Sequence, residues 1–287
     1  MAYEKFIPSV WAEDIDRELE RLCVFVEDCN TKYEGKVKKQ GESVTILGVG
    51  RPTIKTLARK NASDDIDGPE TIEDGSIVMY IHQIAYFNYM VGDIDQAQAV
   101  NGVMEALSSE TSEVLANEVD RYIASKAVDS DVPKLYSAPV KVVSGQAADG
   151  EKNVLDILDE AIQKLQENDI SDNTPIVVTI SPRFYTLLKK AYRELDTDNS
   201  GIIKHGKVGM YGNVTVKRSN NVHKTDKGEV DNIMIRTKRA VAFAKPLTHT
   251  EAYRPEKKFA DAVKGYILYD AKVVRPKEIF NINVKYA

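Results

Sequence analysis

The amino-acid sequence predicts an α+β fold organised around one long helix. Between residues 93 and 126 apolar side chains recur every three or four positions, which is the spacing of one buried helical face. Short strand patterns lie before and after this stretch, and helices and strands do not alternate with the steady rhythm of a βαβ protein. A long helix with strands on both sides of it in the sequence predicts a spine that supports an extended molecule.

The spine helix is predicted over residues 93–126. Asp93 with Gln96 three residues later matches a capping box, and Gly92 ends the element before it. At 1.5 Å per residue, a helix of this span would be about 50 Å long. The stripe breaks near Ser108 and Ser109, so one long helix and two shorter helices with a bend both fit the pattern. The apolar positions of the stripe are Ile94, Ala97, Val100, Met104, Leu107, Val114, Leu115, Val119, Tyr122 and Ile123.

Composition and charge exclude several classes of protein. The chain has 287 residues, which is enough for one large domain or two, and its 43% hydrophobic and 29% charged residues are ordinary values for a globular protein. A net charge of −5 argues against binding nucleic acid through a basic surface. Residues 1–30 hold no apolar run of signal-peptide length, and no window approaches the ~18 apolar residues of a membrane span.

The cysteines and histidines do not predict a metal site. Cys23 and Cys29 are the only cysteines, and they form either one disulfide or two reduced, half-buried thiols. The thiols are favoured, as in a cytosolic protein. None of the four histidines lies at a spacing from Cys, Asp or Glu that is typical of metal ligands. They are His82, His205, His223 and His249. We expect neither a metal nor a cofactor.

The first ninety residues predict a terminal arm and a charged hairpin. A short helical pattern in residues 1–30 ends in the apolar triplet 24–26, and an arm of this kind is held by what it packs on. Strand patterns at 44–47 and 53–57 follow, in a region with few large apolar side chains, and an apolar and aromatic run at 77–90 leads into the spine. The hairpin is either a solvated surface feature or an arm that docks on a neighbouring subunit, and we favour the arm because a basic block precedes an acidic one. The residues expected to contact the neighbour are Arg51, Lys55, Arg59, Lys60, Asp64, Asp65, Asp67 and Glu70.

The second half of the chain predicts a mixed set of helices and strands. Asn153 is placed to cap a helix, residues 176–180 form a buried strand, and Ser181 with Pro182 begins the next helix. Strand patterns follow at 214–216, 232–236, 240–244 and 265–274. In the last strand, 279–286, apolar and polar residues alternate, which predicts a half-buried strand with its polar side chains, Asn281, Asn283 and Lys285, on the solvent face.

A polar loop at 196–207 matches two known motifs incompletely. Residues 201–207 fit the start of a phosphate-binding loop, but Val208 stands where Ser or Thr must reach Mg²⁺, and no strand precedes the loop. Asp196 and Asp198 fit the start of a calcium loop, but Lys207 stands where a bidentate Glu is needed. Residues 63–74 and the Gly48–Gly50 pair also fall short of a calcium loop and a dinucleotide fingerprint. We interpret residues 196–207 as an exposed flexible loop, and the sequence predicts no active site.

Three stretches, in order, resemble the major capsid protein of tailed bacteriophages, the Hong Kong 97 fold family. The first runs from Phe6-Ile7-Pro8 and Trp11 through Tyr33-Glu34-Gly35, 41–46 and 50–54 to 86–89 and 93–98. The second is Gly209-Met-Tyr-Gly212-Asn-Val214-Thr-Val216, leading to Ser219-Asn220. The third is Arg239-Ala-Val-Ala-Phe243-Ala244, then 259–261, Gly265, Tyr269-Asp270-Ala-Lys272-Val273 and Arg275-Pro276. Their order and spacing carry the resemblance, which covers nearly the whole chain.

The resemblance implies a Hong Kong 97-type fold with a long spine helix, an extended β loop, and peripheral and axial domains. Residues 1–33 would be the N-terminal arm, and residues 34–80 the extended loop laid over the adjacent subunit. The peripheral domain would comprise 81–135 and 245–287, and the axial domain 136–244. The loop that would lie near the capsomer axis contains Asp196, Asp198, Asn199, Lys204 and Lys207.

The resemblance also implies a function without catalysis. The chain would assemble in the bacterial host cytoplasm into hexamers and pentamers, forming the icosahedral head shell of the virion around double-stranded DNA, without sequence-specific binding and without a membrane. A separate scaffolding protein and a portal protein are the expected partners. Some relatives crosslink a loop lysine to an asparagine on a neighbour; Lys55 or Lys60 with Asn281 or Asn283 would correspond by region only, so no crosslink is expected. An encapsulin-like compartment holding a cargo enzyme is the alternative, and a nucleotide-using α/β enzyme is a remote one.

Overall fold

The computed structural model describes residues 22–32, 43–49, 56, 74–92, 103–168, 170–171, 173–194 and 208–286, and it has the α+β composition that the sequence predicts. Within these residues the strands form three sheets of two, three and eight strands. No helix in the described ranges combines the length and the apolar character needed to cross a membrane. The predicted loop contacts at 51–70, the loop at 196–207 and residues 1–21 lie outside the described residues.

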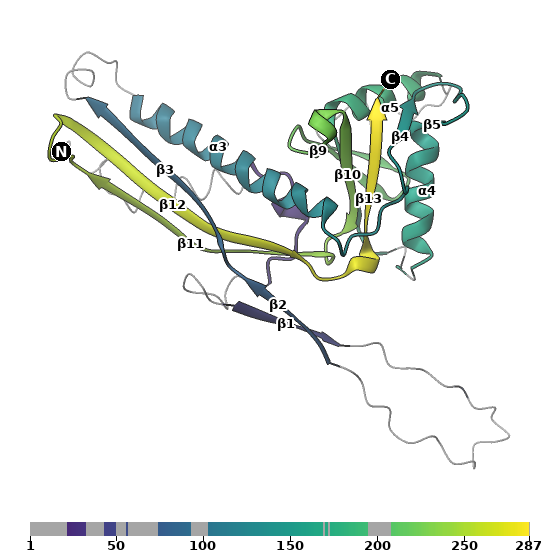
Figure 1. Cartoon of the computed structure of the whole chain (residues 1–287), viewed down its shortest axis with the longest axis horizontal. Helices are drawn as coiled ribbons and strands as arrows, with labels where there is room; N and C mark the ends of the chain where they lie inside the picture. The colour runs from purple at the N-terminus through teal and green to yellow at the C-terminus, as the bar shows by residue number, and fades with distance from the viewer. Residues whose placement is uncertain are drawn as a thin grey trace, which may run out of the picture.

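A long antiparallel sheet and a long helix form one part of the molecule. Strand order in the sheet is β11-β12-β3, and α3 runs beside it along most of its length (Figure 1). Along β3, Ala85 and Phe87 are half-buried while Ile84 and Tyr86 are exposed, because successive side chains of a strand point to opposite faces. The elements are β3 (Gln83–Gly92), α3 (Val103–Ser125), η5 (Lys126–Val128), β11 (Val241–Tyr253) and β12 (Ala260–Val273).

The spine helix is continuous where it is described. It passes through Ser108 and Ser109 without a break, so the alternative of two helices with a bend there is wrong; the capping box at Asp93 lies outside the described residues. Leu115, Val119 and Ile123 of the predicted stripe are buried, but Val114 is 67% exposed. Val114 is excluded from the stripe because adjacent helical residues point about 100° apart, and the neighbouring position carries the core contact.

The eight-stranded sheet forms a second part, covered by two helices. Its order is β5-β4-β13-β10-β6-β8-β7, with β9 also paired to β10, and α4 and α5 pack beside it (Figure 1). Both predicted helix starts are confirmed: Asn153 Oδ1 accepts from the Leu155 N–H at 2.9 Å, and Ser181 Oγ accepts from the Phe184 N–H at 3.2 Å. The elements are β4 (Val140–Val143), β5 (Glu151–Asn153), α4 (Val154–Gln166), β6 (Ile176–Ile180), α5 (Pro182–Glu194), β7 (Val208–Tyr211), β8 (Val214–Arg218), β9 (His223–Thr225), η6 (Asp226–Gly228), β10 (Val230–Thr237), η7 (Pro276–Glu278) and β13 (Ile279–Tyr286).

The prediction of a half-buried last strand is wrong. In β13, Asn281 is 0% exposed and Asn283 is 4% exposed, although both were assigned to a solvent face; Lys285 is exposed as predicted. β13 lies between β4 and β10, so neither edge of the strand is free, and η5 packs against it. The amide of Asn281 donates to Asn232 Oδ1 at 3.1 Å, which is how a buried side-chain amide is accommodated.

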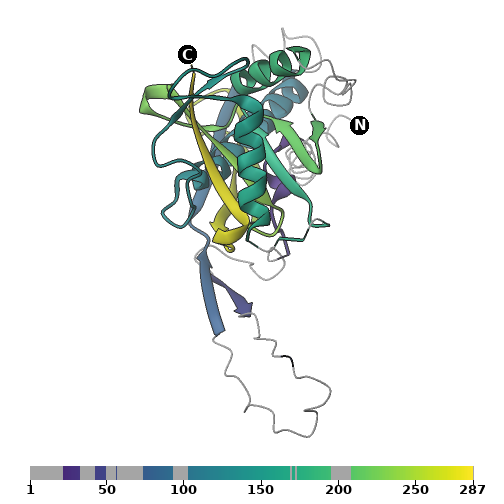
Figure 2. The same cartoon turned by 90° about the vertical axis from the view of Figure 1, so that its right-hand side faces the viewer.

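A two-stranded hairpin projects from the junction of the two larger sheets. β1 (Ser43–Val49) pairs with β2 (Asp74–Tyr80), and two views at right angles both show the pair extending away from the rest of the molecule (Figures 1 and 2). Contrary to the expectation of too few apolar residues, its base buries a small core against β11 and β12. That core comprises Val44, Ile46, Met79, Ile81, Ala242, Ala244 and Leu268.

Candidate functional site

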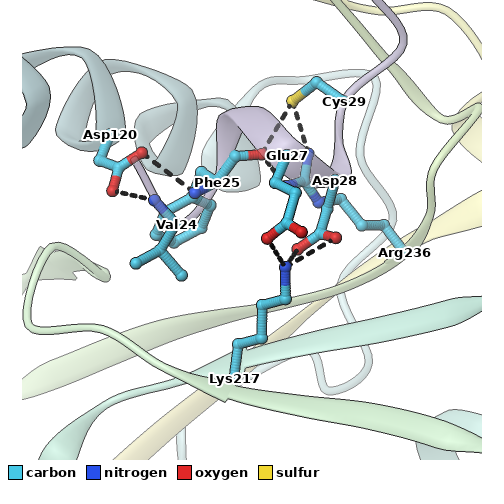
Figure 3. Close-up of polar contacts among 8 residues, drawn as sticks. All are labelled: Val24, Phe25, Glu27, Asp28, Cys29, Asp120, Lys217 and Arg236. Carbon is cyan, nitrogen blue, oxygen red and sulfur yellow. Dashed lines mark hydrogen bonds and ion pairs between the residues drawn. The ribbon is translucent and has the colours of Figure 1, made fainter. Parts of the chain in front are cut away.

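The described residues bring together a group of buried charges where the N-terminal segment meets the body of the molecule. The segment, residues 22–32 with the short turn η2 (Val26–Asp28), lies in the angle between the spine helix and the eight-stranded sheet (Figure 3). We call the group the anchor cluster. It consists of Val24, Phe25, Glu27, Asp28 and Cys29 from the segment, Asp120 from α3, Lys217 from β8 and Arg236 from β10.

Asp120 fastens the segment to the spine helix. It lies on the buried face of α3, 2% exposed, and its two carboxylate oxygens accept from the backbone N–H groups of Val24 at 2.9 Å and Phe25 at 3.0 Å (Figure 3). Burial raises the pKa of Asp120 to about 6, even though the two N–H donors and the nearby Arg236 favour the charged form. This carboxylate therefore titrates nearer to neutral pH than an ordinary aspartate.

Lys217 fastens the acidic part of the segment to the eight-stranded sheet. Its Nζ lies 2.7 Å from Glu27 Oε2 and 2.8 Å from Asp28 Oδ2. The side chains of Lys217 and Asp28 are about nine-tenths buried, whereas that of Glu27 is 72% exposed. Burial acts to lower the pKa of Lys217, but the bonds to both carboxylates outweigh it and the pKa is raised. The hydrogen bond from Lys217 lowers the pKa of Glu27. Lys217 and Asp28 thus form a largely buried ion pair.

Arg236 is a fully buried guanidinium that faces the backbone of the segment. Its Nη2 donates to the Phe25 carbonyl at 2.9 Å and its Nη1 to Cys29 Sγ at 3.1 Å, while its Cζ lies 5.7 Å from the centroid of the Phe25 ring. Nε has no hydrogen-bond partner among the described residues. The segment therefore supplies the carbonyl, sulfur and aromatic face that this buried cation needs.

The two cysteines are buried thiols and form no disulfide, which agrees with the favoured reading except that both are fully rather than half buried. Cys29 Sγ donates to the Phe25 carbonyl at 3.2 Å, and burial raises the pKa of this thiol despite the proximity of Arg236. Beyond the cluster, Asn30 forms a parallel bridge to Ala242: its N–H donates to the Val241 carbonyl at 2.8 Å, and its carbonyl accepts from the Phe243 N–H at 3.1 Å.

A second polar group ties together the spine, the long sheet and the root of the hairpin. Asp270 Oδ1 accepts from the Tyr122 hydroxyl at 2.7 Å, and its Oδ2 accepts from the backbone N–H of His82 at 3.2 Å. Lys272 Nζ donates to the Val78 carbonyl of β2 at 2.8 Å. Burial and the neighbouring Asp270 raise the pKa of Tyr122, which stays a neutral donor. We call Asp270, Tyr122, His82 and Lys272 the hub.

Both groups hold polypeptide segments in place. In the described ranges no three His, Cys, Asp or Glu side chains converge as metal ligands. The charged groups of the anchor cluster are engaged with one another or with backbone atoms of the segment. The arrangement can clamp a chain segment and orient a projecting hairpin.

The thirteen residues that the sequence singled out as contact sites all lie outside the described residues, so those assignments stay predictions. Asn281 and Asn283, which matched crosslinking positions by region, are buried within the sheet and do not present their amides to a neighbour. The anchor cluster was missed. The sequence held one kind of signal for it, a charged residue within or beside an apolar pattern. Asp120 lies in the helical stripe, and Arg236 follows the run Ile233–Ile235.

The comparison with solved structures identifies the fold. No family model matches the chain, and no curated protein matches it by sequence. A solved structure from Mycobacterium phage Che8 is 24% identical, with 91% of this chain and 90% of that chain covered and a TM-score of 0.66. The mature capsid of bacteriophage PhiM1 is 17% identical, with 90% and 87% covered and a TM-score of 0.61. A virus-like particle from Pyrococcus furiosus is 10% identical, with 96% and 98% covered and a TM-score of 0.57. The protein therefore has the capsid fold of tailed phages of the Hong Kong 97 type.

Proposed function

We propose that this protein is the major capsid protein of a tailed bacteriophage and acts as a structural subunit, not as an enzyme. The observation that carries the proposal is the capsid fold. The likeness covers about nine-tenths of this chain and about nine-tenths of the matching chains from phages Che8 and PhiM1. The projecting hairpin and the clamped N-terminal segment support the proposal, because subunits that interlock need segments reaching beyond their own core.

In this proposal many copies form hexamers and pentamers, which close by symmetry into the virion shell around double-stranded DNA. Assembly takes place in the host cytoplasm with a scaffolding protein and a portal protein. The resemblance divides the chain into the arm (1–33), the extended loop (34–80), the peripheral domain (81–135 with 245–287) and the axial domain (136–244). We amend this division at one place and move residues 279–286 from the peripheral to the axial domain, because β13 pairs with β10 and β4 of the eight-stranded sheet.

An encapsulin-like compartment is the alternative, supported by the likeness to the virus-like particle of Pyrococcus furiosus. The TM-score is lower than for the phage structures named above, 0.57 against 0.66 and 0.61, so the phage assignment is preferred. The two differ in contents, since a phage head encloses DNA and a compartment encloses protein.

Light scattering and negative-stain microscopy test the proposal on the purified chain, alone and with its scaffolding protein. We expect closed shells tens of nanometres across, and a nucleic-acid assay of shells from infected cells separates the phage head from the compartment. A monodisperse monomer under both conditions contradicts the shell assignment.

The contact role of the charged loop has its own test. Changing Arg51, Lys55, Arg59 and Lys60 to Glu is expected to leave a folded subunit that forms no stable shells, because like charges would then meet. The matched control exchanges Lys and Arg at the same four positions and is expected to assemble. Normal shells from the glutamate variant contradict the loop assignment.

A further inference from the structure

Four exposed cations gather on two neighbouring turns at one end of the eight-stranded sheet. β10 ends at Thr237 and β13 begins at Ile279, and the two strands pair antiparallel with Arg236 opposite Ile279, so the turn after β10 lies beside the turn η7 that precedes β13. The backbone N–H groups of residues 274 and 275 both donate to the carbonyl of Ala240, at 2.8 and 3.2 Å. We call the four cations the basic patch; they are Lys238, Arg239, Arg275 and Lys277.

One buried carboxylate holds the two arginines of the basic patch together. Glu278 Oε1 lies 2.9 Å from Arg275 Nη1 and 3.3 Å from Arg239 Nη2, and its Oε2 accepts from the Thr237 hydroxyl. The side chain of Glu278 is 8% exposed, whereas each arginine side chain is 50% exposed. Burial acts to raise the pKa of Glu278, but the hydrogen bonds from Thr237 and Arg275 and the charge of Arg239 outweigh it, so the pKa is lowered. The carboxylate therefore stays ionised and fixes both guanidinium groups at the surface.

The basic patch carries more positive charge than its carboxylate neutralises. Glu278 balances one of the two guanidinium groups, and among the described residues neither Lys238 nor Lys277 forms an ion pair. The charge of Lys238 reaches Glu27, but that carboxyl already bonds to Lys217, which has the larger effect in lowering its pKa. The patch is therefore locally positive in a chain whose net charge is −5. A negative total argues against a broad basic surface, but it leaves room for a local one.

The arrangement matches the chemistry of phosphate groups on a polymer. A guanidinium group has five N–H donors in a planar fork, so its contact to Glu278 leaves donors directed to solvent. Arginine binds phosphate oxygens through two parallel hydrogen bonds, and two arginines already held side by side lose little freedom on binding. Lys238 and Lys277 extend the positive surface beyond the arginines along both turns, which fits a row of phosphates better than a single one.

We infer that the basic patch binds the phosphate backbone of double-stranded DNA without reading its sequence. Contacts to phosphate position a protein on a duplex but carry no sequence information, and all four cations of the patch offer only such contacts. The inference rests on the proposed function, which supplies the DNA, and it names the residues through which each subunit would touch that DNA. Free inorganic phosphate has the same chemistry and is separated from DNA by the second measurement below.

The salt dependence of DNA binding tests the inference on the full, unassembled chain. Fluorescence anisotropy of a short labelled duplex gives the binding constant at several salt concentrations, and each phosphate contact contributes about 0.9 to the slope of log K against log salt. Arg239→Gln with Arg275→Gln is expected to reduce this slope by about 2. The control, Lys141→Gln with Lys285→Gln, removes the same charge from side chains that are 47% and 51% exposed, and is expected to keep the slope. An unchanged slope in the arginine variant, or equal losses in both variants, overturns the inference.

A second measurement uses the wild-type chain, because loss of both arginines leaves the buried Glu278 without a cation and destabilises the fold. Acetylation of lysines, read by mass spectrometry, is expected to slow at Lys238 and Lys277 when the duplex is added, and to stay unchanged at Lys141 and Lys285. Inorganic phosphate at the same total phosphate concentration is expected to give no protection. Absence of protection by the duplex, or equal protection by inorganic phosphate, overturns the inference. Neither measurement requires closed shells, so a failure of the proposed shell is seen separately by microscopy.

Discussion

At the scale of single residues, this molecule places its charges where they hold chain segments together. Arg236 has no exposed surface, and among the described residues it contacts a carbonyl, a thiol and an aromatic ring, without a hydrogen bond to a carboxylate. A buried cation of this kind is unfavourable unless its partners are held in place. Because the N-terminal segment supplies the partners of Arg236, the core is stable only when the segment is in position.

The first residue-scale prediction concerns Asp120 and pH. Its pKa is raised from 3.8 to about 6 in the folded protein, so the folded state binds this proton more tightly than the unfolded state. The contribution of protonated Asp120 to stability is present below pH 4 and is lost as the pH rises through 6, by up to about 3 kcal/mol. We expect Asp120→Asn to remove this dependence. Urea unfolding of both proteins at pH 4.5, 5.5 and 7 measures it, and a difference in unfolding free energy that is constant with pH contradicts it.

The second residue-scale prediction compares a buried ion pair with an exposed one. Lys217→Ala leaves Asp28 buried without its cation and is expected to lower the unfolding free energy by about 3–5 kcal/mol. Lys285→Ala breaks the exposed contact to Glu229, 2.7 Å long, and is the matched control with a much smaller loss. Chemical denaturation of the two variants and wild type makes the measurement, and equal losses would show that burial does not set the cost.

At the scale of elements, the periodicity of apolar residues identified the helices and strands that bury one face. It located the spine helix, both capped helices and the strands at 44–47, 176–180, 214–216 and 232–236. It misassigned β13, because alternation cannot distinguish a solvent face from a polar face that is buried under another element, where the Asn281 amide donates to Asn232. The anchor cluster could not be predicted, since its residues come from separate segments and a single sequence does not show which segments meet.

An element-scale prediction concerns the close approach of β3, β11 and β12 at Gly265. A Cβ placed there would lie 2.5 Å from Phe87 Cζ and 2.8 Å from the His249 carbonyl oxygen. The ring can turn away, but the carbonyl belongs to the paired strand and cannot move without loss of pairing. We expect Gly265→Ala to cost about 1–3 kcal/mol, the range for inserting a group into a packed core.

Thermal unfolding of the Gly265→Ala variant checks this, and the matched control is Gly265→Ala in a Phe87→Leu background. Because leucine removes only the ring contact, the double variant should recover part of the loss relative to Phe87→Leu alone, and the part due to the His249 carbonyl should remain. Wild-type stability of Gly265→Ala would contradict the close approach.

At the scale of the whole molecule, the fold joins a long sheet with its spine helix to a second, mixed sheet, and the hairpin leaves from their junction (Figures 1 and 2). The order and spacing of strand and turn residues were enough to predict this capsid fold. The sequence did not reveal the hub, because Asp270, Tyr122 and His82 are separated by up to 188 positions. In the hub a single side chain, that of Asp270, contacts both the spine and the root of the hairpin.

The last prediction follows from this position and rests on the proposed shell. Asp270→Ala removes the acceptor for the Tyr122 hydroxyl and for the His82 N–H, so the hairpin loses its fixed direction relative to α3 while the sheets keep their pairing. Shell size depends on the angles between subunits, and a hairpin with several directions is expected to give shells of mixed diameter from a folded subunit. Negative-stain size distributions measure this, with the exposed Asp149→Ala as the control. Uniform shells of wild-type diameter from Asp270→Ala would mean that the hub does not set the direction of the hairpin.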